Sequence, residues 1–305
     1  MMKNFYFAVI AMAALTLACS TEDPEGNGTG NGNGNGTGTG NGNETYVENA
    51  DGTFTYHGAT YKTVTLSNGS VWMAEPLRHV PEGFTPSADP EDDNAHIWYP
   101  YENADGTAAA VTDEGTIAEK GYLYDMYAAL GGKEVTADNA GTFEGAQGIC
   151  PPGWHIPTRA EFFALCGLSN KNQDESGNQV NQDALFYDST YGGGKLTLYN
   201  EAGWNYVMSG VRMKSNFGAT GRYQATWLSE SNSSLTENYG EPALTYMMSS
   251  TPYQVSTDDE TGEITNIQFF AQMTTFSKTY PEGRVNIAYV STMSGQQLRC
   301  VKDAQ

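Results

Sequence analysis

The chain has 305 residues, of which 36 are acidic and 15 are Lys or Arg, so its formal net charge is −21. Binding to nucleic acid or to anionic lipid needs a basic surface, and this composition excludes both as the role of a folded domain. Aromatic residues make up 12% of the chain, which supplies apolar area that wholly disordered acidic chains lack. We therefore expect most of the chain to fold.

Residues 1–18 have the pattern of a secretory signal peptide. A short basic start precedes an apolar run over residues 5–17, which is too short to span a bilayer. Residues 15–19, Leu-Thr-Leu-Ala-Cys, resemble the cleavage box of bacterial lipoproteins, in which the cysteine becomes the first mature residue and carries acyl chains. This resemblance implies a lipid anchor on Cys19. The alternative is a plain signal peptide with Cys19 buried.

Residues 19–44 are predicted to form a flexible tether. Residues 20–23, Ser-Thr-Glu-Asp, resemble the signals that send lipoproteins of Bacteroidota to the outer face of the outer membrane. From Gly26 to Asn43 glycine alternates with Asn or Thr, and such a run buries nothing that could offset its ordering entropy. Its root-mean-square reach is roughly 30 Å. We therefore expect an outer-membrane, cell-surface-exposed protein whose membrane contact is the lipid on Cys19.

Residues 45–305 are predicted to form one α+β domain that is dominated by β-strands. The Asn68-Gly69 pair between two β-rich runs is a strong hairpin signal, because both residues tolerate positive φ. Past residue 195 the pattern indicates short strands and loops, with a polar turn at residues 258–262. The clearest expected strands are residues 53–56, 60–66, 71–74, 285–290 and 297–301.

About two helices are expected near the middle of this domain. Residues 124–130 precede a Gly-Gly stop and predict a short helix. A second helix should begin at Thr158, because Thr158 and Glu161 have the spacing of a capping box and an apolar face follows up to Gly167.

Residues 80–118 are rich in proline, acids and small residues and show little periodicity, which predicts a long surface insertion. Trp98, Tyr99 and Tyr101 form an aromatic cluster inside it. Flat aromatic side chains stack on sugar rings and anchor protein interfaces at low entropy cost. These three are therefore the candidate ligand contacts. The alternative is a satellite cluster that pins the insertion to the core.

Six segments in order resemble the Fibrobacter succinogenes major paralogous domain (FISUMP domain), a module of secreted and surface proteins of Bacteroidota and Fibrobacter. The pattern departs from the family at Pro76 and Leu228 and by the insertion. The segments are residues 72–77 (Trp-Met-Ala-Glu-Pro-Leu), 121–124 (Gly-Tyr-Leu-Tyr), 148–158 (Gly-Ile-Cys-Pro-Pro-Gly-Trp-His-Ile-Pro-Thr) with Glu161, 209–212 (Ser-Gly-Val-Arg), 227–231 (Trp-Leu-Ser-Glu-Ser) and 298–303 (Leu-Arg-Cys-Val-Lys-Asp).

The helix start at residues 157–162 also looks like that of formylglycine-generating-type enzymes, whose fold is C-type-lectin-like. This similarity implies a C-type-lectin-like fold for the domain. The catalytic cysteine arrangement of those enzymes is missing near the C-terminus, so the resemblance implies no enzymatic activity.

The four cysteines divide between the anchor and the domain. With Cys19 assigned to lipid, Cys150, Cys166 and Cys300 remain. Cys150 and Cys300 lie in the segments that carry the resemblance, which implies a disulfide between them. Cys166 would then be a buried free thiol on the apolar face of the second helix. A Cys150–Cys166 pair is the competing pairing.

The sequence offers few catalytic or metal-binding patterns. His57, His79, His96 and His155 have no metal-ligand spacing, and His155 is interpreted as a hydrogen-bonded structural residue. The acidic runs at residues 91–93 and 258–260 lack calcium-loop spacing. Residues 241–243, Glu-Pro-Ala, resemble the Glu-Pro-Asn motif of sugar-binding C-type lectins, and we interpret this match as chance because the Asn is missing. Residues 192–196 lack the pattern of a phosphate loop. We expect no catalytic residue, metal or cofactor.

The leading hypothesis is a surface lipoprotein that presents a non-enzymatic binding or adhesion module for a glycan or a surface protein. A structural or tip subunit of a surface appendage is the second hypothesis. A carboxylate-dependent hydrolase is the third.

Overall fold

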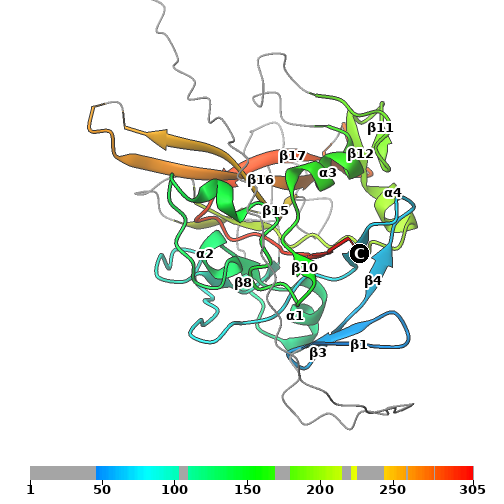
Figure 1. Cartoon of the computed structure of the whole chain (residues 1–305), viewed down its shortest axis with the longest axis horizontal. Helices are drawn as coiled ribbons and strands as arrows, with labels where there is room; N and C mark the ends of the chain where they lie inside the picture. The colour runs from blue at the N-terminus through cyan, green and yellow to red at the C-terminus, as the bar shows by residue number, and fades with distance from the viewer. Residues whose placement is uncertain are drawn as a thin grey trace, which may run out of the picture. The chain divides into compact units, whose positions relative to one another are not determined.

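The structure is a computed structural model that describes residues 46–102, 109–168, 179–214, 221–224, 244–258, 260–277 and 279–304. These residues belong to the second of two units of the chain, Gly42–Gln305. Within them the chain forms short and long strands, four α-helices and one 3-10 helix (Figure 1). The β-dominated α+β class is confirmed. Its identity as a C-type-lectin-like fold stays a prediction.

The largest sheet has five antiparallel strands in the order β11-β12-β17-β16-β15. Residues 244–250 of β15 are buried without alternation, and the register with β16 shifts at three places. The prediction of short strands past residue 195 is wrong for β15 and β16. Continuous burial and the register shifts remove the alternation of apolar and polar residues by which a long strand is recognised in a sequence. The bounds are Tyr187–Asp188 for β11, Gly193–Lys195 for β12, Leu244–Thr257 for β15, Ile264–Thr275 for β16 and Arg284–Ser291 for β17.

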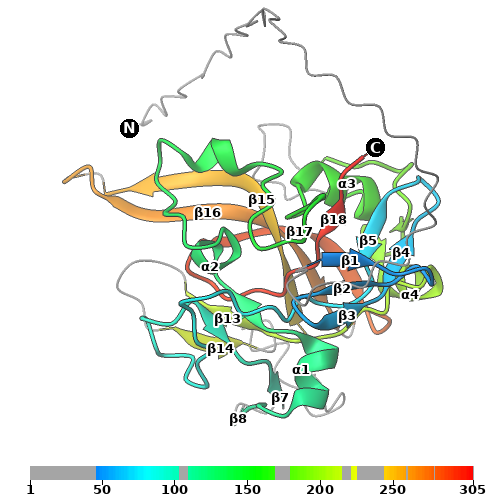
Figure 2. The same ribbon diagram turned by 60° about the horizontal axis from the view of Figure 1, so that its bottom comes forward.

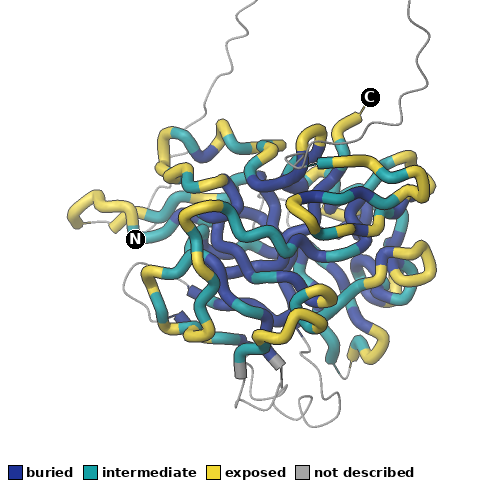
Figure 3. Tube along the Cα trace, turned by 90° about the horizontal axis from the view of Figure 1, so that it is seen from below, coloured by how far each residue is buried: buried dark blue, intermediate teal, exposed yellow. Residues whose placement is uncertain are grey.

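The hairpin of β15 and β16 extends beyond its neighbours in the sheet, and its turn is exposed (Figures 2 and 3). The carboxylate of Asp258 accepts hydrogen bonds from the backbone N–H groups of Glu260, at 3.0 Å, and Thr261, at 2.7 Å. The polar turn predicted at residues 258–262 is therefore present, with Asp259 outside the described residues.

A second sheet has four short strands in the order β10-β18-β5-β4. The predicted turn at Asn68-Gly69 joins β4 to β5, and Gly69 has φ +86°, which is the conformation that favours glycine. The last strand of the chain, β18, lies between β10 and β5. The bounds are Thr63–Thr65 for β4, Val71–Met73 for β5, Trp154–His155 for β10 and Val301–Lys302 for β18.

The remaining strands form small sheets around these two. β1 (Tyr46–Glu48), β2 (Phe54–Tyr56) and β3 (Ala59–Tyr61) form one antiparallel sheet. Three pairs complete the set: β6 (Ile97–Trp98) with β9 (Leu123–Tyr124), β7 (Tyr101–Glu102) with β8 (Ala109–Ala110), and β13 (Val211–Met213) with β14 (Arg222–Gln224).

The two predicted helices are present as α2 (Met126–Ala129) and α3 (Arg159–Cys166), and the described residues contain two more. The helix α1 (Glu114–Lys120) begins within the expected insertion, ends two residues beyond it and is capped by Asp113. The helix α4 (Leu196–Glu201) has no side-chain hydrogen bond at its N-cap, Lys195, so the sequence carries no start signal for it. A 3-10 helix, η1, spans Ala140–Phe143.

The start of α3 has the capping box that the sequence predicts. The Thr158 hydroxyl accepts from the Glu161 backbone N–H, and the Glu161 carboxylate accepts from the Thr158 backbone N–H at 2.8 Å. We expect Thr158→Ala to lower the free energy of unfolding by about 1 kcal/mol, measured by urea denaturation. Thr158→Ser, which keeps the hydroxyl, is the control, and an equal loss in both variants would contradict the capping role.

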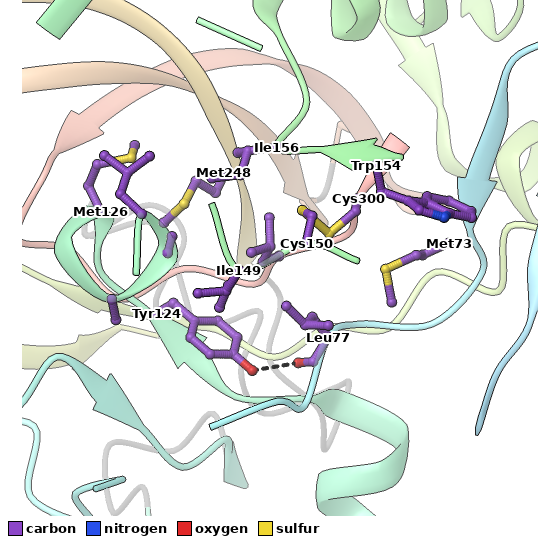
Figure 4. Packing of buried hydrophobic residues seen from close by; sticks show 14 of the residues in the cluster. Met73, Leu77, Tyr124, Met126, Ile149, Cys150, Trp154, Ile156, Met248 and Cys300 are labelled. Atoms are coloured by element: carbon purple, nitrogen blue, oxygen red, sulfur yellow. Dashed lines mark hydrogen bonds between the residues drawn. A yellow bond between two sulfur atoms is a disulfide. The ribbon is translucent and has the colours of Figure 1, made fainter. Parts of the chain in front are cut away.

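Apolar side chains from distant segments meet in two large buried clusters. The first contains Met73, Tyr124, Trp154 and the Cys150–Cys300 disulfide, and the Tyr124 hydroxyl donates to the Leu77 carbonyl at 3.1 Å (Figure 4). The second is built on Trp72, which packs against Phe162 and Trp204, and it includes the free thiol of Cys166. The disulfide therefore joins the middle of the chain to the residue just before β18.

Candidate functional site

The structure does not present the predicted aromatic cluster as a ligand platform. Trp98 and Tyr101 are each 1% exposed, so the prediction of these two as ligand contacts is wrong. Tyr101 stacks on Tyr223 at 4.2 Å between ring centroids. Tyr99 is half-buried and packs edge-on against Tyr122, at 5.7 Å. The satellite-cluster alternative accounts for Trp98 and Tyr101.

A buried arginine packs against Trp98. Arg212 in β13 is 2% exposed, and its guanidinium lies 4.3 Å from the centre of the Trp98 ring. It donates to the carbonyls of Pro90 and Met293, both at 2.9 Å, and to the Asp93 carboxylate at 2.6 Å. Arg212 therefore fixes residues 90–98 to the core, and this part of the expected surface insertion is integrated into the fold.

The described residues instead form an open cleft of about 720 Å³ at the four-stranded sheet. Its walls come from the β4–β5 turn, from the start of α3 with β10, and from the end of the chain at β18. The lining residues are Asn68, Gly69, Ser70, Val71, His155, Glu161, Val301, Lys302, Asp303 and Ala304.

His155 is the centre of the polar wall of this cleft. Its Nδ1 lies 2.6 Å from Asp303 Oδ1, and its Nε2 lies 2.9 Å from Glu161 Oε1. The other oxygen of Glu161 accepts from the backbone N–H and the hydroxyl of Thr158. The side chain of His155 is 15% exposed, whereas that of Asp303 is 57% exposed. A largely buried imidazole thus bridges a fixed carboxylate and an exposed one.

This geometry shifts the proton affinities of the bridge. The hydrogen bond to Glu161 raises the pKa of His155, burial partly opposes this, and Asp303 raises the pKa further. Burial would raise the pKa of Glu161, but the hydrogen bonds from His155 and Thr158 hold that pKa below its ordinary value. The bridge is therefore most stable as an imidazolium between two carboxylates.

A smaller pocket of about 210 Å³ adjoins the cleft, and Val71 and Lys302 line both. Trp154 and Phe54 contribute apolar surface, and Thr53, Thr63 and Thr65 contribute hydroxyls. Beside it the Lys302 ammonium pairs with the Glu48 carboxylate at 2.6 Å.

The Trp154 indole N–H donates to the Tyr46 hydroxyl at 2.9 Å. With the Lys302–Glu48 pair, this contact joins the first described strand, β1, to β10 and β18. The cleft and the smaller pocket therefore form one surface that carries apolar area, hydroxyls and paired charges.

The other histidines lie away from the cleft. The rings of His57 and His79 stack with their centroids 3.9 Å apart. Burial is the main cause that lowers the pKa of His79, to about 4, and the neighbouring His57 lowers it further. His96 Nδ1 lies 2.7 Å from Asp125, whose other oxygen caps α2, and this hydrogen bond raises the pKa of His96. Both sets of contacts fit structural roles.

One residue of the acidic run at residues 91–93, Asp93, forms ion pairs with basic side chains. The Asp93 carboxylate binds Lys214 and Arg212, and these contacts lower its pKa. In the described part of the chain no three His, Cys, Asp or Glu side chains are arranged to hold a metal ion. Cys19, residues 227–231, residues 241–243 and Asp259 lie outside the described residues.

Sequence reasoning did not bring the cleft residues together. The sequence indicates only a structural histidine for His155 and a helix cap for Glu161, and it places Lys302 and Asp303 only in a family motif. One signal points to the cleft: a Cys150–Cys300 disulfide places the segments after each cysteine side by side. In the structure these segments pair as antiparallel strands, with His155 opposite Val301.

The fold and the cleft define the protein as a β-dominated α+β module with an open cleft of mixed polar and apolar lining at its C-terminal strand. The model of the Fibrobacter succinogenes major domain matches residues 67–302, and the chain belongs to this family. No curated protein and no solved structure matches the chain. In the described residues no helix has the length and apolar character needed to cross a membrane.

Proposed function

We propose that this protein is a lipoprotein, anchored through Cys19 at the outer face of the outer membrane, whose domain is a non-enzymatic binding or adhesion module. Its ligand, a glycan or a surface protein, binds in the cleft between the β4–β5 turn and the C-terminal strand. The observation that carries the proposal is the cleft of about 720 Å³ itself, which joins exposed polar groups to apolar surface.

The state of the ionisable groups favours binding over catalysis. A general base needs a lone pair that can reach the substrate, and both ring nitrogens of His155 are engaged by carboxylates. Lys302 is likewise paired, with Glu48. A surface of paired charges and hydroxyls suits recognition by hydrogen bonds.

The binding role is tested by filling the cleft. Ala304 lines it and is exposed, so Ala304→Trp should block the cleft while leaving the core intact. We expect the purified full chain to retain defined probes on a glycan array or a panel of purified surface proteins, and Ala304→Trp to lose them at least ten-fold.

The control is Val180→Trp, an equally bulky change at a residue that is 50% exposed and does not line the cleft. Equal binding by wild type and Ala304→Trp would remove the cleft as the site. The half-buried Tyr99 is tested separately by Tyr99→Ala, whose loss of binding would move the site to the 80–118 segment.

The lipid anchor has its own test. Incorporation of a labelled fatty acid into the full chain should disappear in Cys19→Ala and persist in Cys166→Ala, because Cys166 is buried in the domain. Label that persists in Cys19→Ala would contradict the anchor.

The projecting hairpin of β15 and β16 favours a second candidate, a structural or tip subunit of a surface assembly. The hairpin extends beyond its neighbours in the sheet (Figure 2), and Ile264, the first residue of β16, is 38% exposed. Native mass measurement of the protein released from cells distinguishes the two: a defined polymer or complex supports the assembly subunit, and a monomer supports the free-standing binding module.

A further inference from the structure

The hydrogen-bonding capacity of imidazole sets a condition on the His155 bridge. A neutral imidazole carries one N–H and one lone pair, whereas an imidazolium donates from both nitrogens. Carboxylate oxygens accept but cannot donate when ionised. The two contacts, 2.6 Å to Asp303 and 2.9 Å to Glu161, are therefore both favourable only when His155 is protonated.

Loss of the proton turns one contact into repulsion between a nitrogen lone pair and a carboxylate. Glu161 cannot easily leave, because its second oxygen is held by Thr158 within the capping box. Asp303 is 57% exposed and makes no other side-chain hydrogen bond within the described residues. Among the described residues its backbone makes one hydrogen bond, from its N–H to the Gly153 carbonyl at 2.9 Å. Asp303 is thus the group that is released.

We propose that the imidazolium of His155 is a proton-operated latch that holds Asp303 and Ala304 against the cleft, and that loss of its proton releases them and widens the cleft. The latch itself follows from the geometry of the bridge. Its consequence, ligand binding that changes with pH, rests on the proposed function of the cleft.

The charged groups around His155 fix the direction of the pH dependence. Glu161 of α3 and Asp303 after β18 face the ring, and Lys302 of β18 is paired with Glu48 of β1. Because the folded-state pKa of His155 is raised, the bridge is fully present below the unfolded value of about 6.5 and is lost as the pH rises through the higher folded value. The latch is closed in acid and opens in alkali.

Hydrogen exchange on the full chain tests the latch without a ligand. After correction for the intrinsic exchange rate, protection of the Asp303 amide should fall roughly ten-fold from about pH 6 to about pH 9, the effect of losing one charge-assisted hydrogen bond. In His155→Gln the protection should be low at both pH values. Equal protection in the wild type at both, or a fall that persists in His155→Gln, would overturn the proposal.

His96→Gln is the matched control, because His96 also contacts a carboxylate but lies away from the cleft. The fall in protection should remain in this variant, and its disappearance would assign the titration to His96 instead. Nitrogen-15 chemical shifts of His155 in the wild type need no variant. They should show both ring nitrogens protonated at about pH 6, and a neutral tautomer there would overturn the latch.

Binding of the glycan or protein probe retained by the wild type, measured at both pH values, separates the two proposals. If the latch opens but no probe binds at either pH, the proposed function fails and the latch stands. If a probe binds with equal affinity at both pH values while the latch opens, the coupling between the latch and the ligand fails.

Discussion

Replacing Cys150 and Cys300 together by serine should lower the free energy of unfolding by about 5 kcal/mol. This is the chain-entropy value for a loop closed between cysteines 150 residues apart. Both cysteines are fully buried in the first apolar cluster, so the serine hydroxyls would add a desolvation cost. Urea denaturation followed by tryptophan fluorescence under non-reducing conditions measures the loss.

The control for the disulfide is Cys166→Ala. The Cys166 thiol is buried and free, and burial raises its pKa to about 12, which keeps it protonated and unreactive. Its replacement should cost only packing, about 1 kcal/mol. A double variant as stable as Cys166→Ala, or peptide mapping that joins Cys150 to Cys166, would contradict the pairing.

The second large effect is expected for Arg212→Ala, at about 3 kcal/mol. The change leaves the Pro90 and Met293 carbonyls without their donor and removes the cation above the Trp98 ring. Because Asp93 is half exposed and keeps its ion pair with Lys214, the loss of its contact with Arg212 adds little. Urea denaturation should show the loss, and hydrogen exchange should show reduced protection over residues 90–98.

Two variants make the Arg212 result specific. Arg222→Ala removes an exposed arginine from the partner strand β14 and should change stability by less than about 0.5 kcal/mol. Arg212→Lys keeps the charge but loses the planar fork, so it should recover only part of the stability. Equal losses for Arg212→Ala and Arg222→Ala would show that the buried contacts contribute nothing.

The turn, helix and strand that depend on neighbouring residues could be predicted from the sequence. Asn68-Gly69 formed the expected turn because glycine adopts positive φ there. The helix at Thr158 began at its capping box and ended at Gly167, which has φ +70° in the left-handed region. The strand predicted at residues 285–290 lies within β17.

Elements that depend on distant partners could not be predicted in the same way. Trp98 and Tyr101 lie in a polar segment, and Trp98 is buried by residues far along the chain, among them Leu123 and Arg212. The cleft is likewise built from the β4–β5 turn, β10, α3 and the chain's end, which meet only in the folded sheet. The spacing of these segments in the sequence does not predict that they lie side by side.

The disulfide also changes what a single cut in the backbone does. Residues 151–299 lie between its two cysteines, so one cleavage in this stretch divides the chain but leaves both pieces covalently joined. The piece that carries the C-terminal strand stays linked beside β10, where that strand forms one wall of the cleft. A protein exposed to proteases could thus be nicked and still keep its cleft attached to its N-terminal end.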